Sequence, residues 1–224
     1  MLLAGCAGRT ATRASSALTA PSQSTVTPVA KAAAPSAAVA PSNPPIAGLR
    51  RLSDELLSIS DLPAGVGWAI GTEPPPHRSS PECLKRDAGT ANPPEVDDAT
   101  LTQRAGGVVV AALNEELQRW PNPSPPHAVF RRGVDALNGC SKVTSKDAQG
   151  NPIPGTIAAL ALPRFGDESG AWQFQFSEHG TTLTYDFLAI RQASTLIFAS
   201  YGGFGTPDAN GITQLATIAV RKVS

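Results

Sequence analysis

Residues 171–190 read AWQFQFSEHGTTLTYDFLAI, and this stretch decides the fold. Large apolar side chains recur at every second position, first at Trp172, Phe174 and Phe176 and then from Leu183 to Ala189. A period of two is typical of a β-strand with one buried face. Glu178-His179-Gly180 lies between the two runs as a turn. The stretch therefore predicts two strands joined by a hairpin.

The same period continues on both sides of this hairpin. Thr156 to Leu162 precedes it as an apolar strand, and Thr195 to Tyr201 follows as another, after a turn at Gln192-Ala193-Ser194. Consecutive strands with short connections pair antiparallel, so these four predict a meander. A helix that starts at Thr206-Pro207-Asp208 then covers one face of the sheet. Its apolar stripe consists of Ile212, Leu215, Ala216 and Ala219.

Further toward the N-terminus, helix and strand signals are mixed. A short helix capped by Ser53 is expected to end by Asp61-Leu62-Pro63-Ala64-Gly65, and Trp68 enters a short strand. Residues 73–98 form a turn-rich loop with several prolines. Gly106 to Leu113 favours a strand, but the spacing of Val109, Leu113, Leu117 and Trp120 also fits a helix.

A clearer helix follows, with Ser124 as its N-cap, Pro125 at its first position and Gly139 as its C-terminal cap. Phe130, Val134 and Leu137 lie on one face of it. A loop is expected over Gly150–Gly155. Together these elements predict one α+β domain over residues 49–224, with an antiparallel β-sheet packed against helices.

The N-terminal residues indicate where the domain works. Leu3-Ala4-Gly5-Cys6 resembles the lipobox of a bacterial lipoprotein signal peptide, in which the cysteine carries diacylglycerol on its sulfur. Residues 1–6 are therefore interpreted as the remnant of a signal peptide, although a chance match is the alternative. Only Met1-Leu2 precedes the motif, whereas a signal peptide has a charged region and an apolar region there.

Residues 7–48 are predicted to be a disordered spacer, because Ala, Ser, Thr, Pro and Val make up almost all of them and none is aromatic. Such a composition buries too little apolar surface to offset the cost of ordering the backbone. A spacer of this kind holds a domain away from a membrane, although a low-complexity sequence without a selected length reads the same way.

Three cysteines are present, and the assignment of Cys6 to lipid leaves Cys83 and Cys140. In an exported protein an even remainder indicates a disulfide. Two unrelated buried thiols are the alternative.

The folded part resembles a known family, the PknH-like extracellular sensor domains of mycobacterial receptor kinases and actinobacterial lipoproteins. Each matching piece is short, and together they cover nearly all of the folded part. They are Leu56-Leu57, Asp61-Leu62-Pro63-Ala64-Gly65, Trp68, Cys83, Cys140, Leu162-Pro163, Gly166-Asp167-Glu168-Ser169, Ala171, Arg191, Tyr201-Gly202, Pro207-Asp208 and Leu215-Ala216.

This resemblance implies an α/β sandwich-like domain with a cleft, exposed outside the cytoplasmic membrane and regarded as a ligand-binding sensor without an established ligand or enzymatic activity. The sequence departs from the family twice. It has no cysteines for the second disulfide of the kinase-attached members, and Gln192-Ala193-Ser194 stands where the family often has glycine and asparagine.

No sequence motif for catalysis, a cofactor or a metal is present. Gly166-Asp167-Glu168-Ser169-Gly170 lacks the spacing of a hydrolase elbow and reads as a turn between strands. His77, His127 and His179 are far apart and read as surface residues. Asp97-Asp98 and Glu115-Glu116 are adjacent pairs whose members face different ways, so neither is an acid/base pair by itself. Gly202-Gly203-Phe204-Gly205 reads as a flexible turn at a strand end.

Binding is the better hypothesis. Trp172, Tyr185 and Tyr201 have polar tips on apolar bodies, as residues that line ligand clefts do, and Arg191 is suited to an anionic group. The alternative is that they are core residues and a rim arginine. The 18 basic and 18 acidic residues balance, which argues against a nucleic-acid partner.

The expected protein is thus a non-enzymatic lipoprotein on the outer face of the cell membrane, held by lipid on Cys6 and binding a small molecule, a lipid or a cell-wall fragment. An envelope protein-interaction module is the alternative function, and an envelope hydrolase is the third.

Overall fold

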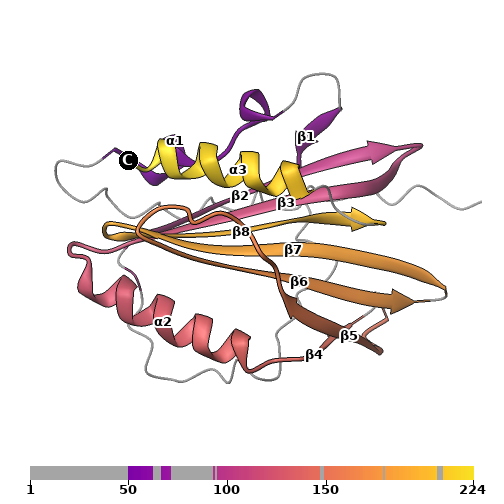
Figure 1. Cartoon of the computed structure of the whole chain (residues 1–224). Helices are drawn as coiled ribbons and strands as arrows, with labels where there is room; N and C mark the ends of the chain where they lie inside the picture. The colour runs from indigo at the N-terminus through magenta and orange to yellow at the C-terminus, as the bar shows by residue number, and fades with distance from the viewer. Residues whose placement is uncertain are drawn as a thin grey trace, which may run out of the picture. The chain divides into compact units, whose positions relative to one another are not determined.

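A computed structural model describes residues 50–62, 67–71, 93, 95–146, 149–178, 180–205 and 209–224. Several of the predictions lie outside the described residues: the signal-peptide remnant with Cys6, the spacer, His77, Cys83, His179 and the expected start of the last helix at Thr206-Pro207-Asp208. The elements in chain order (Figure 1) are α1 (Leu52–Glu55), the 3-10 helix η1 (Ile59–Asp61), β1 (Trp68–Ile70), β2 (Glu95–Ala105), β3 (Val108–Arg119), α2 (Ser124–Asn138), β4 (Lys142–Lys146), β5 (Pro152–Ala159), β6 (Glu168–Glu178), β7 (Thr181–Gln192), β8 (Thr195–Phe204) and α3 (Ala209–Lys222).

The strands form one antiparallel sheet in the order β1-β2-β3-β8-β7-β6-β5-β4. The four-strand meander predicted from the sequence is confirmed as β5 to β8, with Trp172 opposite Phe187 and Phe174 opposite Tyr185. The last strand, β8, then pairs along β3 from Ala111 to Arg119. This pairing joins the N-terminal strands and the meander into a single sheet, so the folded part is one α+β unit, as expected.

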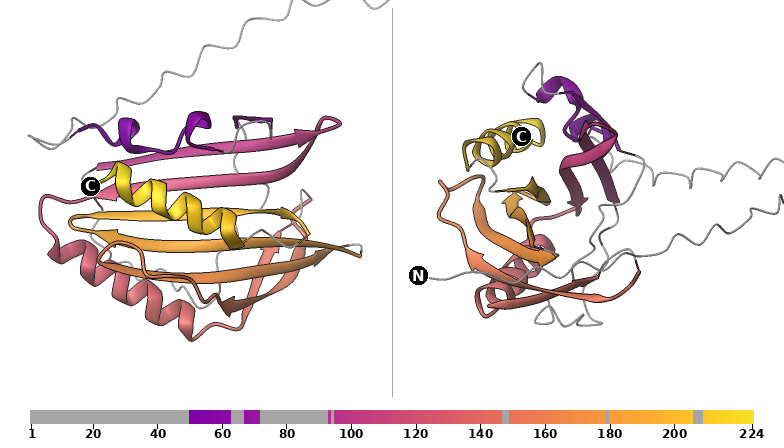
Figure 2. Two further views of the ribbon diagram at one scale, coloured as in Figure 1. Left: turned by 45° about the horizontal axis from the view of Figure 1, so that its top comes forward. Right: turned by 90° about the vertical axis from the view of Figure 1, so that its right-hand side faces the viewer.

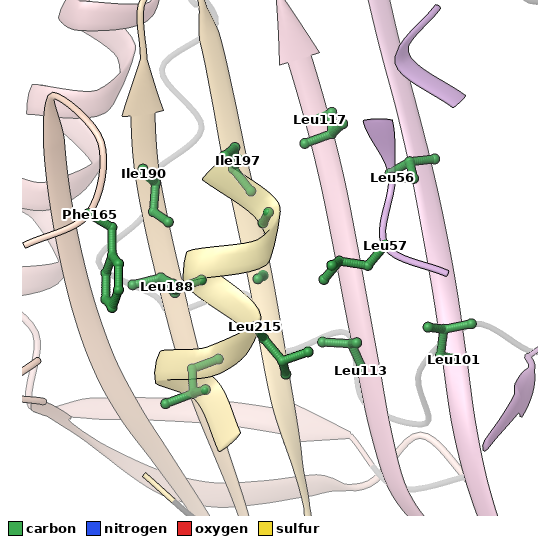
Figure 3. Packing of buried hydrophobic residues seen from close by; sticks show 14 of the residues in the cluster. Leu56, Leu57, Leu101, Leu113, Leu117, Phe165, Leu188, Ile190, Ile197 and Leu215 are labelled. Carbon is green, nitrogen blue, oxygen red and sulfur yellow. The ribbon is translucent and has the colours of Figure 1, made fainter. Parts of the chain in front are cut away.

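Helices lie on both faces of the sheet (Figures 1 and 2). α1, η1 and α3 cover one face, which we call the α3 face, and α2 covers part of the other, the α2 face. Because side chains alternate along a strand, β6, β7 and β8 contribute buried residues to a core on each face. Figure 3 shows the α3-face core, where leucines of the α1 segment and Leu215 of α3 meet side chains of β2, β3, β7 and β8.

The two long helices follow the sequence pattern closely. The N-cap of α2 is Pro123, so Ser124 is the first helical residue and not the N-cap expected from the sequence, with Pro125 directly after it. Gly139 follows the last turn as the C-cap. Phe130 and Leu137 on its inner side are buried against the sheet. Ile212, Leu215, Ala216 and Ala219 of α3 are buried as predicted.

Several sequence-based expectations need correction. The loop expected over residues 73–98 ends earlier, because Glu95 already starts β2. The loop expected over Gly150–Gly155 contains the start of β5, which pairs with β4, a strand that was not predicted. Gly202 to Phe204 continue β8 and are not a flexible turn. The strand interpretation of Gly106–Leu113 is confirmed, with Gly106-Gly107 as the hairpin turn before β3.

The first helix is shorter than predicted. α1 starts at Leu52 without a side-chain cap, so Ser53 does not have the capping role expected for it. A capping box instead forms one turn later, where Ser58 and Asp61 cap η1. Both short helices are held by contacts with the sheet.

Buried charges hold the segment of α1 and η1 on the α3 face. Arg119 at the end of β3 forms an ion pair with Glu55, donates to the backbone oxygen of Arg50 at 2.8 Å and lies 3.8 Å from Glu95. All three charged side chains are less than a tenth exposed. The Leu57 amide donates to Glu115 Oε2 at 2.5 Å. We call residues 50–62 the N-terminal strap.

Gly202 allows two strands to approach closely, and this gives a first prediction. A Cβ at this position would lie 2.1 Å from the Thr184 backbone oxygen and 2.7 Å from the Tyr185 Cα. We expect Gly202→Ala to lower the free energy of unfolding by roughly 1–3 kcal/mol, because the backbone has to shift. Urea denaturation measures the change.

Gly133→Ala is the matched control for this prediction. A Cβ there would meet nothing within 4 Å, and the residue is inside α2. Alanine is the better helix former, so this variant is expected to gain about 0.5–1 kcal/mol. Equal effects of the two substitutions would contradict the close-approach explanation.

Candidate functional site

A concave pocket of about 430 Å³ lies on the part of the α2 face formed by β2, β3, β8 and β7. Side chains reach it from every second position of these strands. Its lining consists of Asp98, Ala99, Thr100, Asn114, Glu115, Glu116, Phe187, Phe198, Ala199 and Ser200. Three of these lining residues direct their side chains to the α3 face: Ala99 and Ala199 pack with its core, and the Glu115 carboxyl accepts a hydrogen bond from the Leu57 amide there.

Strand register arranges the remaining side chains in two rows across the sheet. In the first row Thr100 is opposite Asn114, which is opposite Ser200, which is opposite Phe187. Thr100 Oγ1 donates to Asn114 Oδ1 at 3.0 Å, and Asn114 Nδ2 donates to Ser200 Oγ at 3.3 Å. This row is therefore a hydrogen-bonded polar ladder that ends at an aromatic ring.

The second row contains the charges of the pocket. Asp98 of β2 is directly opposite Glu116 of β3, and Glu116 is opposite Phe198 of β8. Gln118 donates to Glu116 Oε1 at 2.5 Å. Among the described lining residues none is basic, and no ion pair of either carboxylate is found within the described part of the chain.

Two phenylalanines form the apolar end of the pocket. The rings of Phe187 and Phe198 are stacked, with centroids 6.3 Å apart and planes inclined by 14°. Both side chains are only partly buried, although they adjoin the α2-face core. The pocket thus changes from acidic and polar over β2 and β3 to aromatic over β7 and β8.

Of the residues predicted from the sequence to bind a ligand, Trp172 and Tyr185 belong to the α2-face core. Trp172 is 2% exposed, and its Nε1 donates to Asn138 Oδ1 of α2 at 3.2 Å. Tyr185 is half-buried against the same core, and burial raises the pKa of its hydroxyl. Neither residue lines the pocket, and the core alternative for Trp172 matches its position.

Tyr201 faces the opposite side of the sheet. It packs on the α3-face core and contacts the Trp68 ring at a centroid distance of 6.3 Å. The structure therefore does not bring the three predicted aromatic residues together at one site.

Arg191, near the end of β7, joins the start of β6 to the turn between β7 and β8. Its Nε donates to Glu168 Oε2 at 2.6 Å and its Nη1 to Asp167 Oδ2 at 2.9 Å. Nη1 also donates to the backbone oxygen of Ala193 at 3.0 Å, while the Ala193 amide donates to Asp167. These bonds engage the guanidinium within the protein, and its binding of an anionic group stays a prediction.

The Gly166-Asp167-Glu168-Ser169 motif belongs to the same network. His127 Nδ1 lies 2.8 Å from Glu168 Oε2. Partial burial opposes ionisation of Glu168, but hydrogen bonds from Arg191 and His127 outweigh it and lower its pKa. Gly166 has a φ of +58°, and a Cβ there would lie 2.7 Å from the Arg191 backbone oxygen. The motif is thus a structural turn, as the sequence indicated, although Glu168 and Ser169 already belong to β6.

The pocket residues were not predicted from the sequence to bind a ligand, although β3 contains a pattern that indicates an exposed polar face. Polar residues at Asn114, Glu116 and Gln118 alternate with buried positions in β3. The sequence did predict that Glu115 and Glu116 face different ways, and the structure places them on opposite faces. It could not show that Asp98 would be opposite Glu116, because this requires the pairing of β2 with β3.

The predicted disulfide and the predicted lipidation site each involve a cysteine outside the described residues. Cys140 is half-buried beside the α2-face core, but Cys83 is outside the described residues, so their pairing stays a prediction. The lipidation of Cys6 stays a prediction for the same reason. No helix in the described part of the chain has the length and apolar character needed to cross a membrane. Within that part, no cluster of three or more acidic, histidine or cysteine side chains could hold a metal ion.

The fold defines a class of domain: one long antiparallel sheet with helices on both faces. A solved structure shares this fold, the extracellular domain of PknH from Mycobacterium tuberculosis, with a TM-score of 0.61 and 15% sequence identity over 81% of this chain and 98% of that chain. This likeness confirms the fold implied by the sequence resemblance. No protein-family model matches the chain, and comparison with curated proteins found no similar one.

Proposed function

We propose that this protein is a non-enzymatic, extracytoplasmic ligand-binding domain, held at the outer face of the cell membrane by lipid on Cys6 and bearing its ligand site in the pocket on the α2 face. The lipobox-like Leu3-Ala4-Gly5-Cys6 and the Ala/Pro-rich spacer support the location. The fold shared with the extracellular domain of PknH supports a sensor-like role.

The pocket is the observation on which the binding function depends. Ligand sites are concave, have apolar walls and contain a few polar groups that orient the ligand. The pocket has this composition, with two phenylalanines at one end and the Thr100-Asn114-Ser200 ladder along its floor. Its side chains come from central strands of the sheet, and rigid strands hold a site more precisely than loops do.

We expect an aqueous extract of mycobacterial cell envelopes to raise the melting temperature of the full chain. A ligand that binds only the folded state stabilises it by mass action, by about 2.7 kcal/mol at a concentration of 100 Kd. Ser200→Phe should abolish this rise, because the larger side chain occupies the pocket above the ladder. Differential scanning fluorimetry measures both melting temperatures with and without extract.

Ser177→Phe is the control for this experiment, since Ser177 is exposed on β6 and does not line the pocket. It should respond to the extract like the unmodified protein. Circular dichroism verifies that both variants fold. The proposal fails if the extract shifts no melting temperature, or if it shifts that of folded Ser200→Phe equally.

A further inference from the structure

We propose that the ligand of this pocket is an organic cation: a primary or quaternary ammonium group attached to a compact apolar body. This inference rests on the proposed binding function and specifies the chemical class that the site selects. Its basis is the arrangement of charge, hydrogen-bonding groups and aromatic rings in the two rows of the pocket.

Opposed carboxylates are the first reason. Asp98 and Glu116 occupy directly opposite positions on neighbouring strands, where Cβ atoms are about 4.5–5.5 Å apart and like charges destabilise the pair. Lys and Arg are absent from the described lining, and Gln118 gives Glu116 only a neutral hydrogen bond. A positive charge placed between the two carboxylates removes this repulsion.

The polar ladder beside these carboxylates is the second reason. Its hydrogen bonds run from Thr100 to Asn114 and from Asn114 to Ser200. The Thr100 hydroxyl hydrogen is thereby used, which leaves its oxygen lone pairs as acceptors. A primary ammonium group has three donors and no acceptor, so it matches an oxygen-rich corner, whereas a quaternary ammonium group has no N–H and is held by the carboxylates and the rings.

The aromatic end is the third reason. Phe187 and Phe198 are partly open to the pocket, and their stacked rings offer apolar surface next to the acidic row. A free metal ion or a small polyamine has little apolar surface to bury against these rings. An alkyl or aryl body buries apolar area against it, and a cation near a ring face gains about 0.5–1 kcal/mol more.

A series of six-carbon probes that differ only in charge tests the inference. Hexylamine and hexyltrimethylammonium are the cations, 1-hexanol is the neutral analogue and hexanoate is the anion. Isothermal titration calorimetry with the full chain at neutral pH and low salt is expected to show both cations binding at least tenfold more tightly than hexanol, and hexanoate more weakly still. Raising the salt concentration should weaken the cations alone, because screening reduces charge attraction.

Single-charge variants assign the effect to the pocket. Asp98→Asn and Glu116→Gln are each expected to weaken cation binding roughly three- to tenfold and to leave hexanol unchanged. Asp97→Asn is the matched control, since Asp97 does not line the pocket and its Oδ1 accepts from the Asp98 amide, an acceptor that the asparagine side chain retains. This control should bind hexylamine normally.

Three results would overturn the inference. Equal binding of all four probes would assign the pocket to apolar bodies, and preference for hexanoate would reverse the charge. If calcium ions, added as calcium chloride, bind the protein and compete with hexylamine, the two carboxylates form a metal site. Absence of binding by every probe also rejects an organic cation, whereas the binding function itself is decided separately, by the melting temperatures of the unmodified protein and Ser200→Phe with the envelope extract.

Discussion

Arg119→Met is expected to lower the free energy of unfolding by roughly 3–5 kcal/mol, the cost of leaving a buried charge without its partner. The guanidinium is the only described cation with its side chain buried beside Glu55 and Glu95, and it also donates to Thr195 and to the backbone of Arg50. Burial already raises the pKa of Glu55, although Arg119 opposes this shift. Without Arg119 the strap loses its central anchor on β3.

Urea denaturation followed by circular dichroism measures this loss. Arg132→Met is the control, because Arg132 is exposed on α2 and its removal should change stability by less than about 0.5 kcal/mol. The double variant Arg119→Met, Glu55→Met should recover part of the loss, since apolar side chains replace a buried ion pair well. If Arg119→Met is as stable as Arg132→Met, the buried pair does not hold the strap.

Glu115→Gln is expected to become progressively more stable than the natural protein as the pH rises from about 4.5 to 7. Burial raises the pKa of Glu115 to about 7, against a stabilising hydrogen bond from the Leu57 amide and the positive charge of Lys222. In this pH range the folded state binds a proton that the unfolded state releases, so the natural protein loses stability with rising pH. The difference in unfolding free energy should grow by on the order of 3 kcal/mol.

The pH dependence of this difference is the readout, measured by urea denaturation from about pH 4.5 to pH 8. Glutamine keeps an oxygen that accepts from the Leu57 amide. Burial of its amide nitrogen lowers the stability of this variant by an amount that does not depend on pH, so the slope of the difference is unaffected. Glu115→Met lacks the acceptor and should be less stable by a further constant amount with the same slope. A difference that does not change with pH in either variant would contradict a protonated Glu115.

The sequence predicted those elements whose apolar side chains repeat strictly. Trp172, Phe174 and Phe176 identified β6, and Phe130 and Leu137 identified α2, because one face of each is buried. These signals are local, because the burial of one face of a strand or helix leaves a regular apolar pattern within that segment of the sequence. The meander and the two helix layers followed from them.

The features that the sequence did not predict, β2, β4 and the pocket, depend on which strands pair and in which register. β2 begins with Glu95-Val96-Asp97-Asp98, whose acidic residues look like a loop until β3 is placed beside them. β4 carries Lys142 and Lys146 at its ends and lies at an edge of the sheet. The pocket depends on the same kind of information, because Asp98, Asn114 and Ser200 are far apart in sequence and meet only through strand register.

The strap also determines how the domain responds to mechanical load. Arg50 donates to the backbone oxygen of Lys222, and Lys222 forms an ion pair with Asp61 at 2.7 Å, so the two ends of the described domain are fastened to each other as well as to β3. Tension applied through residue 50 loads the hydrogen bonds of Arg50 with Lys222 and Arg119 first, and the Arg119–Glu55 ion pair after them. The polar and acidic rows of the pocket lie on the opposite face of β3, so tension at residue 50 loads the strap before it reaches these rows.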